Sequence, residues 1–170
     1  MIDIHFLISI LSDGFFAAIA AIGFAVISNP PRKAILISAL LAAIGHGLRF
    51  YLLKHVGLDL PTSSFIAAFS IGFFSIFFAR LIHCPAEVFS FPSLLPMIPG
   101  MFAYKTILSL VQFSQCTDDN LSMKILVSIF RNGTTTVFIL FALVVGVAIP
   151  MFIFYKQSYS MTRLLKLIKK

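Results

Sequence analysis

The sequence predicts an all-α integral membrane protein with about five transmembrane helices, the fourth of them broken by proline and glycine. The 170 residues are 59% hydrophobic and only 11% charged, with a mean hydropathy of +1.02, whereas soluble domains are nearer half apolar and a quarter charged. Nearly uncharged apolar runs of about 20 residues, the length that crosses a bilayer as a helix, follow one another along the chain. We therefore expect one membrane domain and no soluble catalytic domain.

The expected spans are separated by short polar turns. They cover residues 4–28, 34–53, 63–82, 88–113 and 125–155, which form a transmembrane domain over 1–155, and residues 156–170 form a basic cytoplasmic tail. The turns between the spans read NPPRK, KHVGLDLPT, HCPAE and SQCTDDNLSMK. No positive region precedes the first run, so we expect it to stay in the membrane rather than to be cleaved as a signal peptide.

The positions of Lys and Arg predict the orientation, because basic residues concentrate on the cytoplasmic side. With the tail inside, that side also holds Arg32, Lys33 and Arg80, while Lys54 and Lys124 lie outside. We therefore expect the N-terminus outside and the C-terminus inside. The net charge of +7 belongs to span ends and tail and does not suggest a nucleic-acid partner. The tail itself could contact anionic membrane lipids or a partner, or simply be a solvated segment that fixes topology.

Small residues recur at four-residue spacing in four of the spans, which places them on one helix face. These residues are Ala17, Ala21 and Ala25; Ala39, Ala43 and Gly47; Ala68 and Gly72; and Ala142 and Gly146. Such faces let helices approach closely in lipid, so each of these spans is expected to have a protein neighbour. Five spans enclose little interior for a solute pathway, and we therefore also expect partner subunits.

Five ionisable side chains fall inside the expected spans: Asp13, His46, Arg49, Lys105 and Arg131. Such residues are rare in lipid and are usually functional or paired. Counted from the outer span ends, four of them lie roughly 9–14 Å deep at about 1.5 Å per residue, and Arg49 lies about one turn outside this layer. The arginines and Lys105 could instead snorkel to the headgroups, and His46 could be a packing histidine. Asp13 is too short to snorkel and must be neutral, paired or hydrated.

The fourth span is interrupted by PSLLPMIPGMFAYK, residues 92–105. Pro96 and Pro99 each remove a helical hydrogen bond, to a carbonyl four residues earlier, at about 3 kcal/mol in a regular helix. Irregular backbone at membrane depth is tolerated only inside protein or beside a wet cavity, and broken helices in transporters expose backbone groups at the substrate site. Gly100 ends the irregular piece, and the free N–H groups of the half-helix that follows favour a carboxylate, with Lys105 adding positive charge. The alternative is a span that is merely kinked by proline.

Sequence patterns for catalysis are missing. The chain has no G-x-S-x-G, no H-E-x-x-H and no phosphate-binding loop. Cys84 and Cys116 form neither a metal-ligand spacing nor a disulfide framework. We therefore expect no enzyme, no cofactor and no metal site.

Two signatures, IGHGLRFYL at residues 44–52 and PMIPGMFAY at residues 96–104, resemble the threonine/serine exporter (ThrE) family, in particular its small split subunit of the YjjB type. The N-terminal DGFFAAIAAIGFAVISNPPRKA, the length and the order of spans fit as well, up to about residue 155. The matching positions are His46, Arg49, Pro96, Pro99, Gly100 and Tyr104, whereas Lys105 and the tail are not part of the pattern. The resemblance implies a secondary exporter of the bacterial inner membrane, paired with a larger five-span subunit. Family substrates include threonine and serine, and the split pair resembles a succinate exporter.

These residues lead to a hypothesis of a subunit in a hetero-oligomeric transporter that exports a small carboxylate. The substrate-binding candidates are Arg49, Pro96, Pro99, Gly100, Tyr104 and Lys105, with Arg49 or Lys105 as counter-charge, and the proton-coupling candidates are Asp13 and His46. The alternatives are a non-transporting structural or regulatory subunit, a channel and, less readily, a membrane-embedded enzyme.

Overall fold

The computed structural model describes residues 4–154, and these residues form helices and turns with no β-strand among them. The helices are α1 (Ile4–Ile27), α2 (Arg32–Tyr51), η1 (Leu52–Val56), α3 (Leu60–Ile82), α4 (Glu87–Leu94), η2 (Leu95–Met97), α5 (Gly100–Gln115) and α6 (Asp119–Ile153). The element η1 is a π-helical turn, and η2 is a 3-10 turn. The predicted basic tail, 156–170, lies outside the described residues.

The number of helices that could cross a membrane agrees with the sequence. Four are long and apolar enough: α1, α2 extended by η1, α3 and α6. A fifth is obtained if α4–η2 and α5, separated by a short break, count as one span. The all-α fold class with four or five helices that could span a membrane is therefore confirmed, and the helical chain breaks between Met97 and Gly100 as expected. That the two pieces form one fourth span, the orientation and the limits of the membrane domain stay predictions.

Two helices begin earlier than the predicted spans because carboxylates cap them. α3 starts before residue 63, where the backbone N–H and the hydroxyl of Thr62 donate to the Asp59 carboxylate at 3.1 and 2.7 Å. α6 starts inside the polar loop, where the backbone N–H of Asn120 donates to the Asp118 carboxylate at 2.9 Å. Carboxylates satisfy free N–H groups at a helix start and oppose the helix dipole, so these polar stretches begin helices rather than extend loops.

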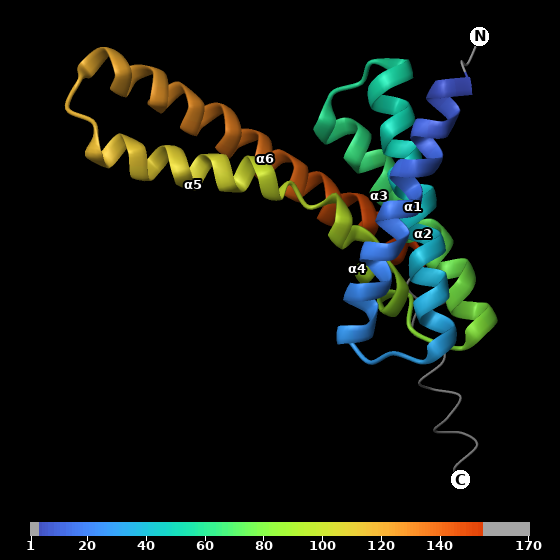
Figure 1. Ribbon diagram of the computed structural model, residues 1–170. Helices are drawn as coiled ribbons and strands as arrows, with labels where there is room; N and C mark the ends of the chain where they lie inside the picture. Colours follow the sequence, from blue (N-terminus) through green and yellow to red (C-terminus); the bar gives the residue numbers. More distant parts are fainter. Residues whose placement is uncertain (1–3, 155–170) are drawn as a thin grey trace. The chain divides into compact units, whose positions relative to one another are not determined.

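The described residues divide into two compact units. The first comprises residues 4–97 and 142–154, and the second comprises residues 98–141. In the first unit α1 packs along α2, which also packs on α3 and α4 (Figure 1). In the second unit α5 and the first part of α6 form a helical hairpin (Figure 1).

Small residues bring α1 and α2 together. Ala17, Ala21 and Ala25 of α1 are all buried. A Cβ atom added to Gly14 would lie 2.9 Å from the carbonyl oxygen of Ala43, so the α2 backbone passes directly over this glycine. The predicted small face of the first span therefore contacts a helix of the same chain, as helix packing in lipid requires.

Glycines also bring α3 and the last part of α6 together. A Cβ atom added to Gly72 would lie 2.7 Å from the carbonyl oxygen of Val147, and one added to Gly146 would lie 2.7 Å from that of Phe65. Each glycine thus faces the backbone of the other helix. Backbone atoms cannot move aside as a flexible side chain can. This contact therefore depends on having glycine, which has no side chain, at both positions.

We predict that Gly146→Ala destabilises the protein although alanine is the better helix former. Alanine gains about 1 kcal/mol of helix propensity over glycine, but its methyl group would displace the Phe65 backbone, and overpacking of this kind costs ~1–3 kcal/mol. Gly23→Ala is the matched control, since a Cβ atom there meets nothing within 4 Å. Thermal unfolding in detergent should show a lower midpoint for Gly146→Ala than for Gly23→Ala, and equal midpoints would contradict the close α3–α6 contact.

We also predict that the cap at Asp59 weakens in acid. The hydrogen bonds from the Thr62 side chain, and then from its backbone N–H, hold the pKa of Asp59 below its ordinary value. The folded state therefore favours the carboxylate, so the stabilisation is present above the ordinary aspartate pKa of about 3.9 and is lost as the pH falls through the lower folded value. The difference in thermal midpoint between wild type and Asp59→Ala should be constant near neutral pH and should shrink in acid. A difference that stays constant in acid would show that charge plays no part in the cap.

Candidate functional site

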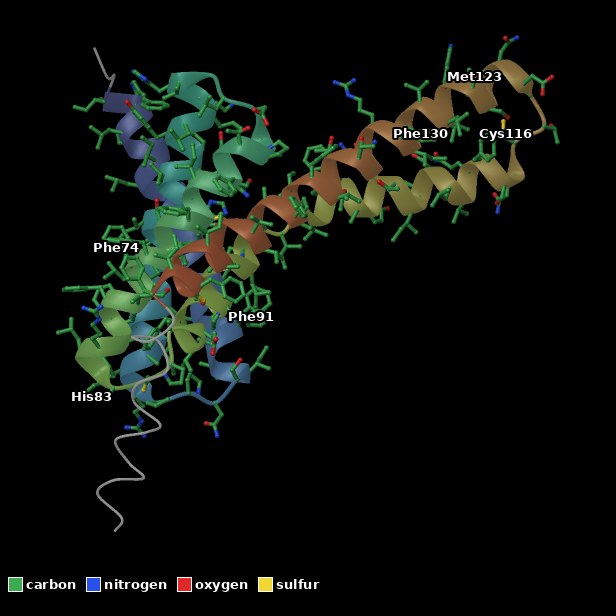
Figure 2. All side chains as sticks on the ribbon, turned by 180° about the vertical axis from the view of Figure 1, so that it is seen from behind. Phe74, His83, Phe91, Cys116, Met123 and Phe130 are labelled. Carbon is green, nitrogen blue, oxygen red and sulfur yellow. The ribbon has the colours of Figure 1, made fainter. Side chains whose placement is uncertain are left out.

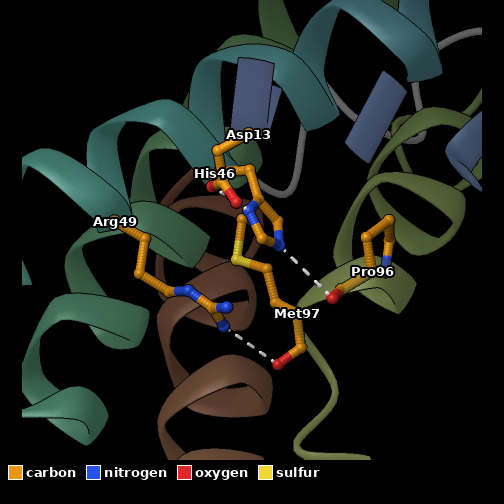
Figure 3. A network of polar contacts seen from close by, with 5 residues as sticks. All are labelled: Asp13, His46, Arg49, Pro96 and Met97. Atoms are coloured by element: carbon orange, nitrogen blue, oxygen red, sulfur yellow. Dashed lines mark hydrogen bonds and ion pairs between the residues drawn. The ribbon is translucent and has the colours of Figure 1, made fainter. Parts of the chain in front are cut away.

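A cluster of polar contacts links α1, α2 and the broken fourth span (Figure 3). His46 of α2 contacts the Asp13 carboxylate of α1 through Nδ1 at 2.6 Å and the carbonyl oxygen of Pro96 through Nε2 at 3.3 Å. Arg49, one turn further along α2, donates from Nη1 to the carbonyl oxygen of Met97 at 3.0 Å. We call these residues the polar cluster; all of them belong to the first unit.

The sequence of α2 places both donors and makes room for their acceptors. His46 and Arg49 are three residues apart and share a helix face. A Cβ atom added to Gly45 would lie 2.8 Å from Cε of Met97 and 2.5 Å from Cδ1 of Ile71, so the ends of these two side chains lie against the glycine and would have to move for a larger residue. Gly45 therefore lets the side chain of Met97 lie against α2 next to His46.

The carbonyls of Pro96 and Met97 lack donors from their own helix because that helix ends at Met97. The last four carbonyls of any helix lack donors within it. In a continuous helix the amide of Gly100 would donate to Pro96, but it donates instead to Ile98 at 2.8 Å. Pro99, with φ −79° and ψ 59°, is the centre of this inverse γ-turn. The next helix then begins with Gly100, the residue that the sequence predicted as the end of the irregular piece.

The sequence pointed to different carbonyls from those that the side chains bind. The prolines remove the helical donors of Pro92 and Leu95, but His46 and Arg49 bind Pro96 and Met97. Met97 was missed as a site residue, since its contribution is a backbone atom that the residue type does not reveal. Counting back four residues from the restart at Gly100 would have identified the carbonyl of Pro96.

The contacts of His46 depend on its protons. A carbonyl only accepts hydrogen bonds, so Nε2 must carry a hydrogen to bond to Pro96. Nδ1 then donates to an ionised Asp13 or accepts from a protonated one, and both forms hold the same number of protons. If one proton leaves the pair, either Nε2 presents a lone pair to Pro96 or Nδ1 presents one to the carboxylate. The attachment of α2 to η2 and α1 therefore depends on the protonation of the Asp13–His46 pair.

The polar cluster is only partly enclosed. The side chain of His46 is 13% exposed and that of Asp13 is 34% exposed. Arg49 has five N–H donors, and within residues 4–154 it donates one hydrogen bond, to the carbonyl oxygen of Met97. Chemically, the cluster offers a half-buried cation with free donors next to a carboxylate–imidazole pair that can gain or lose a proton.

The remaining predicted site residues belong to the second unit. Pro99 precedes the first turn of α5 and Gly100 begins it, while Tyr104 is 60% exposed and Lys105 is exposed. Arg131 of α6 is exposed as well. Among residues 4–154, neither Lys105 nor Arg131 forms an ion pair. Lys105 therefore stays a predicted substrate-binding residue, and Arg131 stays a candidate for reaching the headgroups.

A second polar contact in the second unit was not foreseen. The hydroxyls of Ser109 on α5 and Ser128 on α6 lie 3.3 Å apart, and the Asn132 amide donates to the Ser128 hydroxyl at 3.1 Å. Hydrogen bonds between helices are a usual means of association in lipid. Serine and asparagine carry no charge, so their presence in an apolar helix gives no signal of a site.

We predict that Arg49→Met loosens η2. A hydrogen bond from a charged donor contributes ~1.5–3 kcal/mol, so amide hydrogen exchange in the peptide covering residues 93–98 should become at least about tenfold faster. Arg131→Met, which removes an exposed arginine without a bound carbonyl, is the control. Unchanged exchange in Arg49→Met would show that the bond to Met97 does not hold the segment.

Comparisons with known proteins agree with the signatures around this cluster. The chain matches the profile of the family described as Threonine/Serine exporter, ThrE, over residues 13–153. It is also 38% identical over 153 residues to an uncharacterized protein of Haemophilus influenzae, a match that covers 90% of this chain and 50% of that protein. The chain thus spans about half the length of this curated relative, and no solved structure matches it. Because the family profile covers most of its length, the chain belongs to the threonine/serine exporter family.

Proposed function

We propose that this protein is one component of a two-component secondary transporter that exports a small carboxylate across the bacterial inner membrane. Membership of an exporter family and the apolar helices support a membrane transporter rather than an enzyme. The family's description supports threonine and serine as substrates. We also propose a dicarboxylate such as succinate as a substrate class, since it is a small carboxylate too.

The polar cluster at the broken helix is the observation that carries this proposal. Arg49 holds the irregular segment through one donor, and its remaining donors suit a carboxylate, which a guanidinium can bind with two parallel hydrogen bonds. Partial burial strengthens such a contact, because the local dielectric is lower than in water. Broken helices with substrate at the break are a recurring design of secondary transporters.

Proton coupling is proposed for the Asp13–His46 pair. The pair lies one helical turn from Arg49 and contacts the same segment of backbone. Loss of a proton removes one of the two contacts of His46, so protonation changes how η2 is held beside the substrate. This gives a physical link between protonation of the Asp13–His46 pair and binding of a substrate carboxylate to Arg49.

A larger five-span subunit is the proposed partner. The chain matches only half of its Haemophilus influenzae relative, which supports a transport unit larger than this chain. The exposed third of the Asp13 side chain also leaves the cluster open on one side. A second polypeptide that carries the other half would supply further walls of the pathway.

Efflux from liposomes that contain the co-purified pair tests these roles. Arg49→Met should lower efflux of the carboxylate at least about tenfold, since a charged hydrogen bond contributes ~1.5–3 kcal/mol, and Arg49→Lys should restore only part of it because the planar fork is lost. Asp13→Asn should abolish the dependence of efflux on a pH gradient. Arg131→Met, the matched arginine control, should transport as wild type does.

Two outcomes would count against the proposal in different ways. If Arg49→Met and Asp13→Asn both keep wild-type efflux and pH dependence in an assembled pair, the site assignment is wrong. If the larger subunit exports the solute alone, this chain is instead a structural or regulatory subunit.

A further inference from the structure

An aromatic groove lies on the first unit, away from the polar cluster. It has a volume of about 460 Å³ and is lined mainly by α3, with Ile44 from α2 and Phe154 after α6. We call it the aromatic groove; its lining from α3 includes Phe73, Phe74, Phe77 and Arg80. Figure 2 shows Phe74 on this helix and His83 at the helix end.

The shape of the groove suits a flexible chain better than another helix. Transmembrane helices associate through small residues that allow close approach, but the small residues of α3, including Ala68, Gly72 and Ala79, are already buried within the first unit. Bulky rings remain on the outer side: Phe73 and Phe74 meet edge to face at 5.8 Å, and Phe77 is 57% exposed. A hollow between such rings can take an acyl chain, which adapts to an irregular apolar wall.

One cation lies at the end of this apolar groove. Arg80 is exposed in the last turn of α3, and within residues 4–154 no carboxylate pairs with it. The connection between α2 and α3 is short, so Arg32 and Lys33 at the start of α2 lie at the same end of the first unit (Figure 1). The start of α4 brings one carboxylate, Glu87, to this end as well, so three cations stand against one described carboxylate. The balance favours a negatively charged ligand, and an arginine can bind a phosphate through two parallel hydrogen bonds.

We infer that the aromatic groove binds an anionic phospholipid, with an acyl chain between the phenylalanines and the phosphate on Arg80. The charge of Arg80 favours lipids with an anionic headgroup, and the phenylalanines of the groove contact the acyl chain. Basic residues at a membrane surface bind anionic lipids in this way at ~1 kcal/mol per residue. The site is independent of the proposed transport function, since it shares no residue with the polar cluster.

Native mass spectrometry of the purified full chain tests the inference. The protein is mixed with equal amounts of phosphatidylglycerol and phosphatidylcholine that carry identical acyl chains. Wild type should retain phosphatidylglycerol about fivefold over phosphatidylcholine, the ratio that corresponds to ~1 kcal/mol. Arg80→Gln should remove most of this preference, while Lys124→Gln, which neutralises an exposed cation at the start of α6, should keep it. Phe77→Ala should weaken retention of both lipids.

The alternatives give distinct results. A wild-type preference for phosphatidylglycerol that survives in Arg80→Gln would overturn the site. So would displacement of the lipid by inorganic phosphate alone, because the acyl chain would then contribute nothing. A photo-crosslinking amino acid at position 77 should yield a lipid adduct, and a protein adduct in its place would assign the groove to a partner subunit.

Discussion

Backbone that leaves helical geometry inside a membrane must find its hydrogen-bond partners in protein, because lipid offers none. In this chain the requirement falls on the carbonyls where η2 ends, and α2 meets it with His46 and Arg49. Each such carbonyl left without a donor would cost several kcal/mol. The break therefore lies where α2 presents these side chains, and Gly45 beside them leaves room for the end of the Met97 side chain.

The same requirement explains why charge enters the interior of the first unit. The imidazole of His46 contacts a carbonyl through one nitrogen and a carboxyl group through the other. Either both ring nitrogens carry a hydrogen, or one does and the carboxyl group supplies the hydrogen for the second contact. Asp13 supplies the second half of that arrangement from α1. A structural need for hydrogen bonds and a chemical capacity for proton exchange thus arise from one set of atoms, which is the combination that the proposed proton coupling requires.

Much of the fold could be predicted because lipid imposes simple rules on sequence. Apolar runs gave the helices, prolines gave the break, and counting residues from the span ends placed Asp13 and His46 at one depth. The helix starts capped by Asp59 and Asp118 could not be told from loops, because aspartate favours both helix N-caps and turns. Met97 could not be found at all, because its role belongs to its backbone. The π-helical turn η1 and the division into two units depend on tertiary packing that residue patterns do not encode.

Two hydrogen bonds, from His46 and from Arg49, hold η2 against α2. They leave one helix from positions three residues apart, about 4.5 Å along its axis, and they end on consecutive carbonyls. Only the hydrogen bond from His46 responds to protons, whereas the guanidinium keeps its charge at any physiological pH. Loss of the histidine bond would therefore leave the bond from Arg49 as the remaining side-chain hydrogen bond from α2 to η2 among residues 4–154. The end of η2 is thus held by two hydrogen bonds of different kinds, one from a group of fixed charge and one from a ring whose hydrogens can change.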